Sequence, residues 1–144
     1  MKWLDLVATV CGTTFGTPDL AQNIDSVAAQ YNVERTLILS VVWGESRCKP
    51  SAQGTSDDRG LMQVIPKWHG SRMKRLGVTN LYDPIQNLKT GTDILSSLRV
   101  TEDPVKALAI YNGGFTPPSR SYNYAHSVLA RKAEYDSALE GEDE

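Results

Sequence analysis

A chain of 144 residues with 40% hydrophobic and 22% charged side chains has the size and composition of one soluble globular domain. Its formal net charge of −2 gives no overall electrostatic reason to expect a nucleic-acid partner. A membrane-spanning helix is indicated by about 18 or more consecutive apolar residues, and no stretch of this sequence approaches that length. No membrane span is therefore expected.

The N-terminal segment contains a short apolar run, Leu6 to Cys11, that faintly resembles a secretory signal peptide. The run is shorter than a signal usually requires, Asp5 interrupts its approach, and no convincing small-residue cleavage site follows. We therefore treat residues 1–18 as an N-terminal extension. Cys11 and Cys48 permit one disulfide, but their spacing cannot establish it, and buried free thiols are the default expectation.

The remainder predicts a mainly α-helical domain over residues 19–137, followed by an acidic tail over 138–144. Two helix starts are marked by an aspartate N-cap and a proline at the first helical position, at Asp83 and Asp103. A small β-hairpin between residues 51 and 64 is left open. From start signals, breakers and apolar spacing, we expect helices over 17–32, 34–46, 66–76, 84–100, 104–112 and 122–139.

The most informative helix is the one predicted over 34–46, because its core-facing side ends in a carboxyl group. Leu37, Val41 and Glu45 are spaced i, i+4, i+8 and so share one face. Burial and the negative end of the helix dipole both favour a protonated carboxyl near neutral pH, as a general acid requires. The alternative is a glutamate turned outwards at a frayed helix end, and this stretch alone favours that alternative.

Four ordered blocks of sequence carry a resemblance to a known family. They are Glu45-Ser46 followed by Pro50 and Ala52, then Gly60-Leu61-Met62-Gln63, then Tyr82 to Leu88, and last Ala107 to Gly114. With a closing helix that contains Tyr124, the chain resembles the lysozyme-like lytic transglycosylases, specifically the catalytic domain of the soluble type. The resemblance spans about Ala21 to Tyr135 and implies a helical fold of the goose-lysozyme and lytic transglycosylase type.

Two departures from the family pattern bear on this resemblance. Residues 56–59 read Ser-Asp-Asp-Arg, where many members have a small residue, Gly, Ala and a variable residue. An aspartate before the glycine is closer to secretion-associated and phage members. The closing helix has Arg120 and Ser121 where glutamate and threonine are common, which leaves the pairing around Tyr124 open.

The resemblance implies a peptidoglycan lytic transglycosylase that cleaves the MurNAc-GlcNAc β-1,4 bond and leaves 1,6-anhydro-MurNAc ends. Such cleavage requires protonation of the leaving oxygen as an oxocarbenium-like centre forms. In the family, one glutamate first acts as the acid and then removes the proton from the muramic acid's own 6-hydroxyl. Carried over to this chain, Glu45 does both, without a metal or a cofactor.

Six further residues are expected to bind substrate beside Glu45, and each has a structural alternative: Ser46, Met62, Gln63, Tyr111, Asn112 and Tyr124. Ser46 either orients Glu45 or merely ends the helix. Met62 and Gln63 are expected to line the cleft, and the alternative for Gln63 is a structural hydrogen bond.

The other three candidates lie in the last two predicted helices. Tyr111 either contacts the scissile sugar or belongs to the core, and Asn112 either meets an acetamido group or caps the helix end. Tyr124 either hydrogen-bonds Glu45 or packs in the core. Asp58 is a possible second carboxylate, but a loop hydrogen bond or a solvated charge is the favoured interpretation.

Two other function classes stay open. A hydrolytic muramidase, such as an endolysin, uses water and leaves free reducing ends; a non-catalytic virion or wall-binding module keeps only the scaffold. The expected partners are peptidoglycan glycan strands and, by resemblance, virion tail or ejection proteins or a secretion apparatus. The expected place of action is the periplasm or cell wall, reached by virion delivery or release at lysis. The alternative is export by a weak N-terminal signal.

Overall fold

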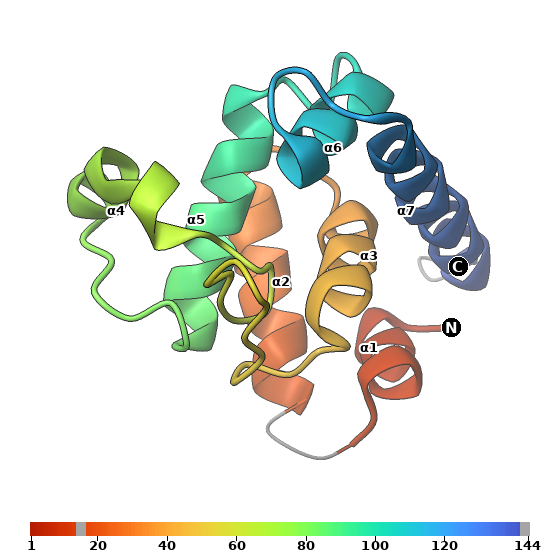
Figure 1. The fold of residues 1–144 in the computed structure, drawn as a ribbon. Helices are drawn as coiled ribbons and strands as arrows, with labels where there is room; N and C mark the ends of the chain where they lie inside the picture. Colours follow the sequence, from red (N-terminus) through yellow and green to blue (C-terminus); the bar gives the residue numbers. More distant parts are fainter. Residues whose placement is uncertain (14–16, 142–144) are drawn as a thin grey trace.

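The structure, a computed structural model, describes residues 1–13 and 17–141 as helices joined by short connections and one longer loop (Figure 1). In chain order the elements are α1 (Trp3–Cys11), α2 (Thr17–Tyr31), α3 (Arg35–Ser46), the 3₁₀ turn η1 (Pro66–Trp68), α4 (Gly70–Leu76), α5 (Pro84–Ser97), α6 (Pro104–Gly113) and α7 (Ser119–Ala138). The predicted mainly α-helical fold is confirmed. Within the described ranges, no helix is long and apolar enough to cross a membrane.

The predicted helix starts at two aspartates are present in atomic detail. Asp83 accepts a hydrogen bond from the Gln86 backbone N–H at 2.9 Å, and Asp103 accepts one from the Lys106 N–H at 3.2 Å. Each bond satisfies a backbone donor that the helix itself leaves unpaired. The helix expected over 66–76 is instead divided into η1 and α4 at His69, whose φ of −130° departs from helical geometry.

The hydrophobic core is built around α3, which lies between α2 and α7 in Figure 1 and contacts α1 as well. Its aliphatic side chains are at most 4% exposed: Leu37, Ile38, Leu39, Val41 and Val42. Burying one such side chain contributes about 1.5–3 kcal/mol, so this short helix is held firmly in place. Whatever polar group its C-terminal end carries is therefore fixed in position too.

One side of α3 is joined to α7 by hydrogen bonds. The Ser40 hydroxyl donates to the Val128 carbonyl at 2.7 Å, and Arg131 donates to the Ser40 carbonyl at 2.9 Å. Nearer the start of α3, the Thr36 hydroxyl donates to the Asp136 carboxylate at 2.7 Å. The two helices run antiparallel, and these directional bonds set their register. The first turns of α7 consequently lie beside the last turn of α3.

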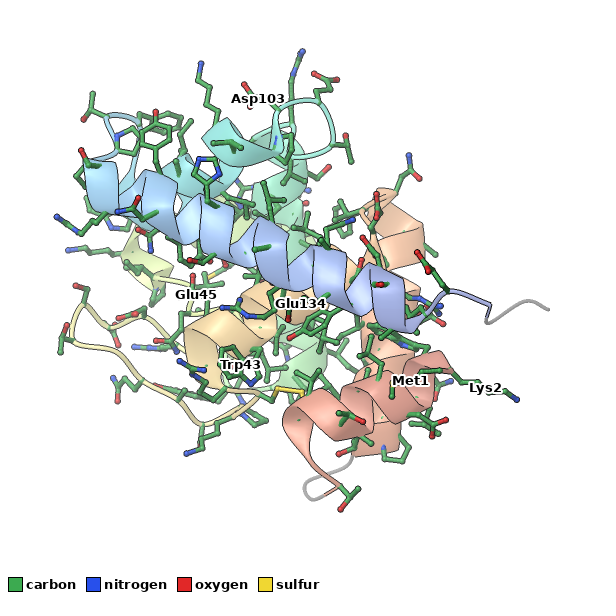
Figure 2. All side chains as sticks on the ribbon, turned by 90° about the vertical axis from the view of Figure 1, so that its right-hand side faces the viewer. Met1, Lys2, Trp43, Glu45, Asp103 and Glu134 are labelled. Atoms are coloured by element: carbon green, nitrogen blue, oxygen red, sulfur yellow. A yellow bond between two sulfur atoms is a disulfide. The ribbon has the colours of Figure 1, made fainter. Side chains whose placement is uncertain are left out.

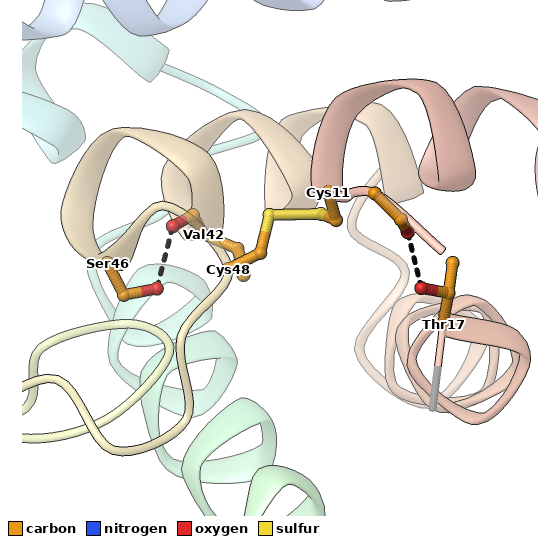
Figure 3. The surroundings of a disulfide bond; sticks show 6 residues. Cys11, Thr17, Val42, Ser46 and Cys48 are labelled. Atoms are coloured by element: carbon orange, nitrogen blue, oxygen red, sulfur yellow. Dashed lines mark hydrogen bonds between the residues drawn. A yellow bond between two sulfur atoms is a disulfide. The ribbon is translucent and has the colours of Figure 1, made fainter. Parts of the chain in front are cut away.

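The expectation of free thiols was wrong, because Cys11 and Cys48 form a disulfide (Figure 3). Their Cα atoms are 5.6 Å apart, although 37 positions separate them in sequence. The bond ties the last residue of α1 to the chain just after α3. Helix α1 also contributes Trp3, Leu6 and Val7 to the hydrophobic core. The segment treated as an extension thus includes a helix packed against the rest of the molecule.

The possible hairpin at 51–64 is absent from the described residues, which form no strand there. The segment has only two isolated antiparallel bridges, Gln53 with Arg59 and Arg59 with Val64. Left-handed backbone at Asp57, Gly60 and Gln63, with φ of 62°, 76° and 53°, turns the chain too often for extended pairing. The result is a compact loop packed against the start of α5.

Candidate active site

Glu45 is the penultimate residue of α3, and its carboxylate accepts a 2.7 Å hydrogen bond from the Tyr124 hydroxyl of α7. Figure 2, which faces α7, shows Glu45 beneath this helix. The bond spans 79 residues of sequence and follows from the α3–α7 register described above. Glu45 also lines a cleft, so the outward-turned alternative is wrong and the Tyr124 contact is present.

The electrostatics of Glu45 suit an acid that works near neutral pH. Burial raises the pKa of Glu45 to about 7, the Tyr124 hydrogen bond opposes this rise, and the negative charge of Asp58 adds to it. Burial also holds the pKa of Tyr124 well above its usual range. Tyr124 is therefore a hydrogen-bond donor throughout the pH range in which Glu45 titrates.

The cleft has a volume of about 810 Å³ and extends from Glu45 across the ends of α5 and α6. Its walls come from the loop after α3, from η1 and α4, from the last turns of α5 and α6, and from the α6–α7 connection. The lining residues are Glu45, Asp58, Gln63, Val64, Ile65, Trp68, His69, Arg72, Ile94, Ser97, Leu98, Ile110, Tyr111, Asn112, Gly113, Gly114, Phe115 and Arg120. A mixed apolar and polar lining of this size is typical of a ligand site.

The loop that forms one wall is fastened to α5 by Asn87. This fully buried amide donates to the carbonyls of Arg59 and Leu81, both at 2.8 Å, and accepts from the Met62 N–H at 2.8 Å. Gly60 is needed at this point, because an added Cβ would lie 2.3 Å from both the Asn87 amide nitrogen and the Leu81 carbonyl. The Asn87 anchor therefore fixes where the next residues of the loop stand.

Gln63 lines the cleft, whereas Met62 lies behind it. The Gln63 amide donates to the carbonyls of Ala52 and Gly60 at 3.1 and 3.0 Å, so its nitrogen is used within the loop. Met62 is 0% exposed, and its sulfur accepts a 3.9 Å bond from Thr92 of α5. The predicted pair is therefore split between a cleft residue and a core residue.

Tyr111 and Asn112 both reach the cleft from the end of α6. The Tyr111 hydroxyl donates to the Met62 carbonyl at 2.6 Å, which ties α6 to the loop wall. The Asn112 side chain accepts a 2.8 Å bond from the Ser121 hydroxyl of α7. Gly113 permits this close approach, because a Cβ there would lie 2.2 Å from the Ser121 oxygen. Each side chain thus has a structural bond and a surface on the cleft.

Ser46 and Asp58 do not pair with Glu45. Ser46 is 5% exposed and is not part of the cleft lining, and its hydroxyl donates to the Val42 carbonyl one turn earlier at 3.0 Å (Figure 3). Asp58 lines the cleft, but its carboxylate accepts the Ser56 backbone N–H at 3.2 Å. The helix-end interpretation of Ser46 and the loop interpretation of Asp58 account for these contacts.

Comparison with known proteins places this arrangement in a family. The model of the "Transglycosylase SLT domain" matches residues 22–136, which include every residue of the cleft. The chain belongs to the transglycosylase SLT domain family. Among solved structures, this SLT domain is similar to an inactive mutant of lytic transglycosylase Slt from Pseudomonas aeruginosa, with a TM-score of 0.72 at 19% identity. That alignment covers 82% of this chain and 24% of the other.

Curated relatives of the SLT domain include a phage protein. The "Transglycosylase" of Enterobacteria phage PRD1 is 38% identical over 94 residues, covering 65% of this chain and 34% of that protein. "Membrane-bound lytic murein transglycosylase E" of Buchnera aphidicola is 36% identical over 83 residues, which are 53% of this chain and 38% of the relative. The chain thus spans little more than a third of the length of these two relatives.

Sequence reasoning missed the part of the SLT cleft that lies on η1, α4, the end of α5 and the α6–α7 connection. His69 and Arg72 contribute polar groups there, and burial together with the Arg72 charge lowers the pKa of His69. Trp68 and Phe115 contribute exposed rings. The one sequence signal for this part of the cleft was that Trp68 closely follows the Gly60–Gln63 block along the chain. Among the residues that the structure describes, no group of His, Cys, Asp and Glu side chains is arranged so that it could hold a metal ion.

Proposed function

We propose that this SLT domain cleaves the MurNAc-GlcNAc β-1,4 bonds of peptidoglycan as a lytic transglycosylase. The observation that carries the proposal is Glu45, a carboxyl with a pKa of about 7, held by Tyr124 at an open cleft. The names of the relatives support the chemistry, since they are called transglycosylase or lytic murein transglycosylase. The solved Slt mutant, which is described as inactive, carries a single glutamate-to-glutamine change.

In the first step Glu45 acts as the general acid. Its proton passes to the glycosidic oxygen as the bond between that oxygen and the MurNAc anomeric carbon breaks. The leaving GlcNAc hydroxyl gains the proton, and positive charge develops on the MurNAc ring. Glu45 becomes a carboxylate, which the Tyr124 hydroxyl stabilises by its hydrogen bond.

In the second step the same carboxylate acts as the base. Glu45 removes the proton from the 6-hydroxyl of MurNAc, and that oxygen bonds to the anomeric carbon to close the 1,6-anhydro ring. Glu45 is protonated again, so no water is consumed and no second carboxylate is needed. A pKa near 7 suits both roles, because the proton is then given and taken with similar ease.

Product analysis tests this proposal. Purified peptidoglycan is digested with the parent chain and with Glu45→Gln, and the released fragments are separated and weighed by mass spectrometry. We expect the parent to leave 1,6-anhydro ends, each lighter by one water than a hydrolysed end, and Glu45→Gln to release almost nothing. Free reducing ends as the main product would reject the transglycosylase assignment.

A hydrolytic muramidase is the second candidate, and one observation favours it. Asp58 lines the same cleft and its charge acts on Glu45, so a second carboxylate is within electrostatic reach of the acid. A hydrolase of this kind would use such a group to activate water. The Asp58 carboxylate already accepts a loop N–H, which makes it the weaker proposal.

The proposed setting is the periplasm or cell wall, with delivery by a phage virion or release at lysis. The phage relative supports this setting, and virion tail or ejection proteins or a secretion apparatus are the proposed partners. The Cys11–Cys48 disulfide supports a destination outside the reducing cytosol. The phage route is tested by immunoblotting for this protein in purified virions, in lysates and in the host cytosol. Its absence from both virions and lysates would contradict that route.

A further inference from the structure

Two large aromatic side chains of the cleft are open to solvent. Trp68 is 69% exposed and Phe115 is 85% exposed, whereas Trp3 of the core is 6% exposed. Both rings line the Glu45 cleft, and they come from separate parts of the chain: Trp68 from η1 and Phe115 from the α6–α7 connection. In Figure 1, α4, which follows η1, and α6 lie on either side of α5. The rings therefore belong to two different walls of the cleft.

The backbone holds both rings at the cleft although neither ring is packed in the core. Trp68 sits in a 3₁₀ turn that begins at Pro66, and the His69 N–H donates to the Pro66 carbonyl at 3.1 Å. Phe115 follows Gly114, which has a φ of 84°, and precedes the Pro117-Pro118 pair that leads into α7. A proline two residues away restricts the backbone next to each ring: Pro66 precedes Trp68, and Pro117 follows Phe115. A restricted backbone reduces the conformational freedom that the chain loses when a ligand covers these rings.

Exposed aromatic rings in a cleft are poorly solvated and favour a ligand with flat, weakly polar faces. The faces of a pyranose ring carry C–H groups that suit the electron-rich face of an aromatic ring. Lys67 lies 4.9 Å from the centre of the Trp68 ring and covers part of it, yet most of the ring surface stays open. An alternating N-acetylated sugar strand would therefore have a stacking surface on each wall.

We propose that Trp68 and Phe115 are stacking platforms that hold two sugar units of one glycan strand across the Glu45 cleft. This inference rests on the proposed function, since it takes peptidoglycan as the ligand. It assigns the two rings to substrate binding and not to bond cleavage, because neither ring can transfer a proton to the scissile oxygen. Their removal should weaken binding while leaving the acid intact.

Binding is measured without turnover in the Glu45→Gln background. Trp68→Ala and Phe115→Ala are each added, and the Kd for soluble, uncrosslinked peptidoglycan strands is compared with that of the background. We expect the Kd to rise roughly three- to tenfold for each variant, the range of one aromatic stacking contact. Tyr122→Ala is the matched control, because Tyr122 is a 40% exposed aromatic outside the cleft lining. Its Kd should not change.

Tryptophan fluorescence gives an independent signal from one wall. Of the three tryptophans, Trp3 is buried and Trp43 contacts the guanidinium groups of Arg47 and Arg131, at 3.5 and 4.7 Å from its ring centre. Glycan binding should shield Trp68 from a soluble quencher such as acrylamide. Trp68→Phe keeps a ring for stacking and loses the fluorophore, so binding should persist while the protection disappears.

The outcomes separate this inference from the proposed function. In chains that retain Glu45, Trp68→Ala and Phe115→Ala should raise KM and leave kcat within about twofold. If the parent cleaves peptidoglycan but both alanine variants bind with the background Kd, the two platforms are rejected and the proposed function stands. If the parent neither binds nor cleaves peptidoglycan, the proposed function fails and the platforms fail with it. Melting curves that match the background exclude unfolding as the cause of weaker binding.

Discussion

Two regions of the cleft are built in opposite ways. The Glu45 centre, which we define as Glu45, Tyr111 and Tyr124, stands on helices α3, α6 and α7, and its polar groups are paired by hydrogen bonds of 2.6 and 2.7 Å. The cleft rim, defined as Asp58, Trp68 and Phe115, stands on η1 and irregular connections, and both of its rings are mostly exposed.

This difference predicts which measurements each region controls. In the Glu45 centre, burial raises the pKa values of all three side chains, so a small change there alters protonation and therefore rate. In the cleft rim, side chains can be removed without leaving a buried polar group unpaired. We expect substitutions in the centre to change kcat and the pH profile, and substitutions of the rim aromatics to change KM.

The largest effect is expected from Glu45→Gln, which removes the proposed acid from the centre. The amide cannot deliver a proton, so activity on peptidoglycan should fall by about 1000-fold or more, as measured by turbidity of a cell-wall suspension. The fold should survive, because glutamine has nearly the same shape and its oxygen can still accept from Tyr124. A variant with more than a tenth of parental activity and an unchanged melting curve would remove Glu45 as the acid.

The same variant also tests how the buried Glu45 carboxyl changes the stability of the fold with pH. The pKa of Glu45 lies at about 7 in the folded chain against an ordinary 4.5, so its stabilising contribution is complete below pH 4.5 and is lost as pH rises through 7. The loss amounts to at most about 3 kcal/mol. Glu45→Gln should therefore melt at or above the parent temperature at pH 8. A variant that melts far below the parent at pH 8 would contradict the pKa of about 7.

The disulfide belongs to neither region and should affect stability alone. Its removal in the double variant Cys11→Ala, Cys48→Ala frees a loop whose ends are 37 positions apart, which predicts a loss of about 4 kcal/mol in the free energy of unfolding. Denaturant melts of the parent, with and without reductant, are the comparison. Because the bond reaches no cleft residue, the pH profile of activity should keep its shape below the melting temperature. A shifted alkaline limb would instead connect α1 to the Glu45 centre.

Tyr124→Phe tests the centre from its second residue. The change deletes one oxygen that stabilises the carboxylate, so the pKa of Glu45 should rise and the alkaline limb of the pH–rate profile should move upwards. The rate should fall by about 10- to 100-fold, because positioning and tuning of the acid are lost, while stability changes by about 1 kcal/mol. An unchanged rate and an unchanged limb would make Tyr124 a packing residue only.

Asp58→Asn is expected to have the smallest effect on the rate and to shift the pKa of Glu45 in the direction opposite to that of Tyr124→Phe. Loss of the rim charge should lower the pKa of Glu45, so the alkaline limb should move downwards. The rate should fall by less than about tenfold, or roughly 1.4 kcal/mol in the barrier. A loss as large as that of Glu45→Gln would favour a two-carboxylate hydrolase. The opposite shifts of Tyr124→Phe and Asp58→Asn make each variant a control for the other.

The centre could be predicted from sequence far better than the rim. Spacing put Glu45 on the same face as Leu37 and Val41, and the family resemblance then favoured its role as the acid and brought in Tyr111 and Tyr124. Local signals such as Asp83 before proline were enough to locate helix starts. These are features of short segments, and the hydrogen-bonded contact between α3 and α7 then follows from helix packing.

Other features of the structure depend on contacts that short sequence patterns do not encode. Ser46 follows Glu45 directly, but adjacent helical residues point about 100° apart, and its hydroxyl donates to the Val42 carbonyl one turn earlier. Gln63, which follows Met62, has left-handed backbone geometry, and this turns the two side chains to different sides of the loop. The Cys11–Cys48 pair and the reach of the cleft to Phe115 depend on how distant segments meet, which spacing cannot supply.

The central claim is that the Glu45 centre completes the reaction without water, and digestion in water enriched in heavy oxygen tests it most directly. Peptidoglycan is cleaved by the parent chain in this solvent, and the newly formed ends are weighed by mass spectrometry. If Glu45 takes its second proton from the sugar's own 6-hydroxyl, the new ends carry the 1,6-anhydro ring and contain no heavy oxygen. One heavy oxygen at each new reducing end would mean that water attacks, and the single-carboxylate transglycosylase account would be wrong.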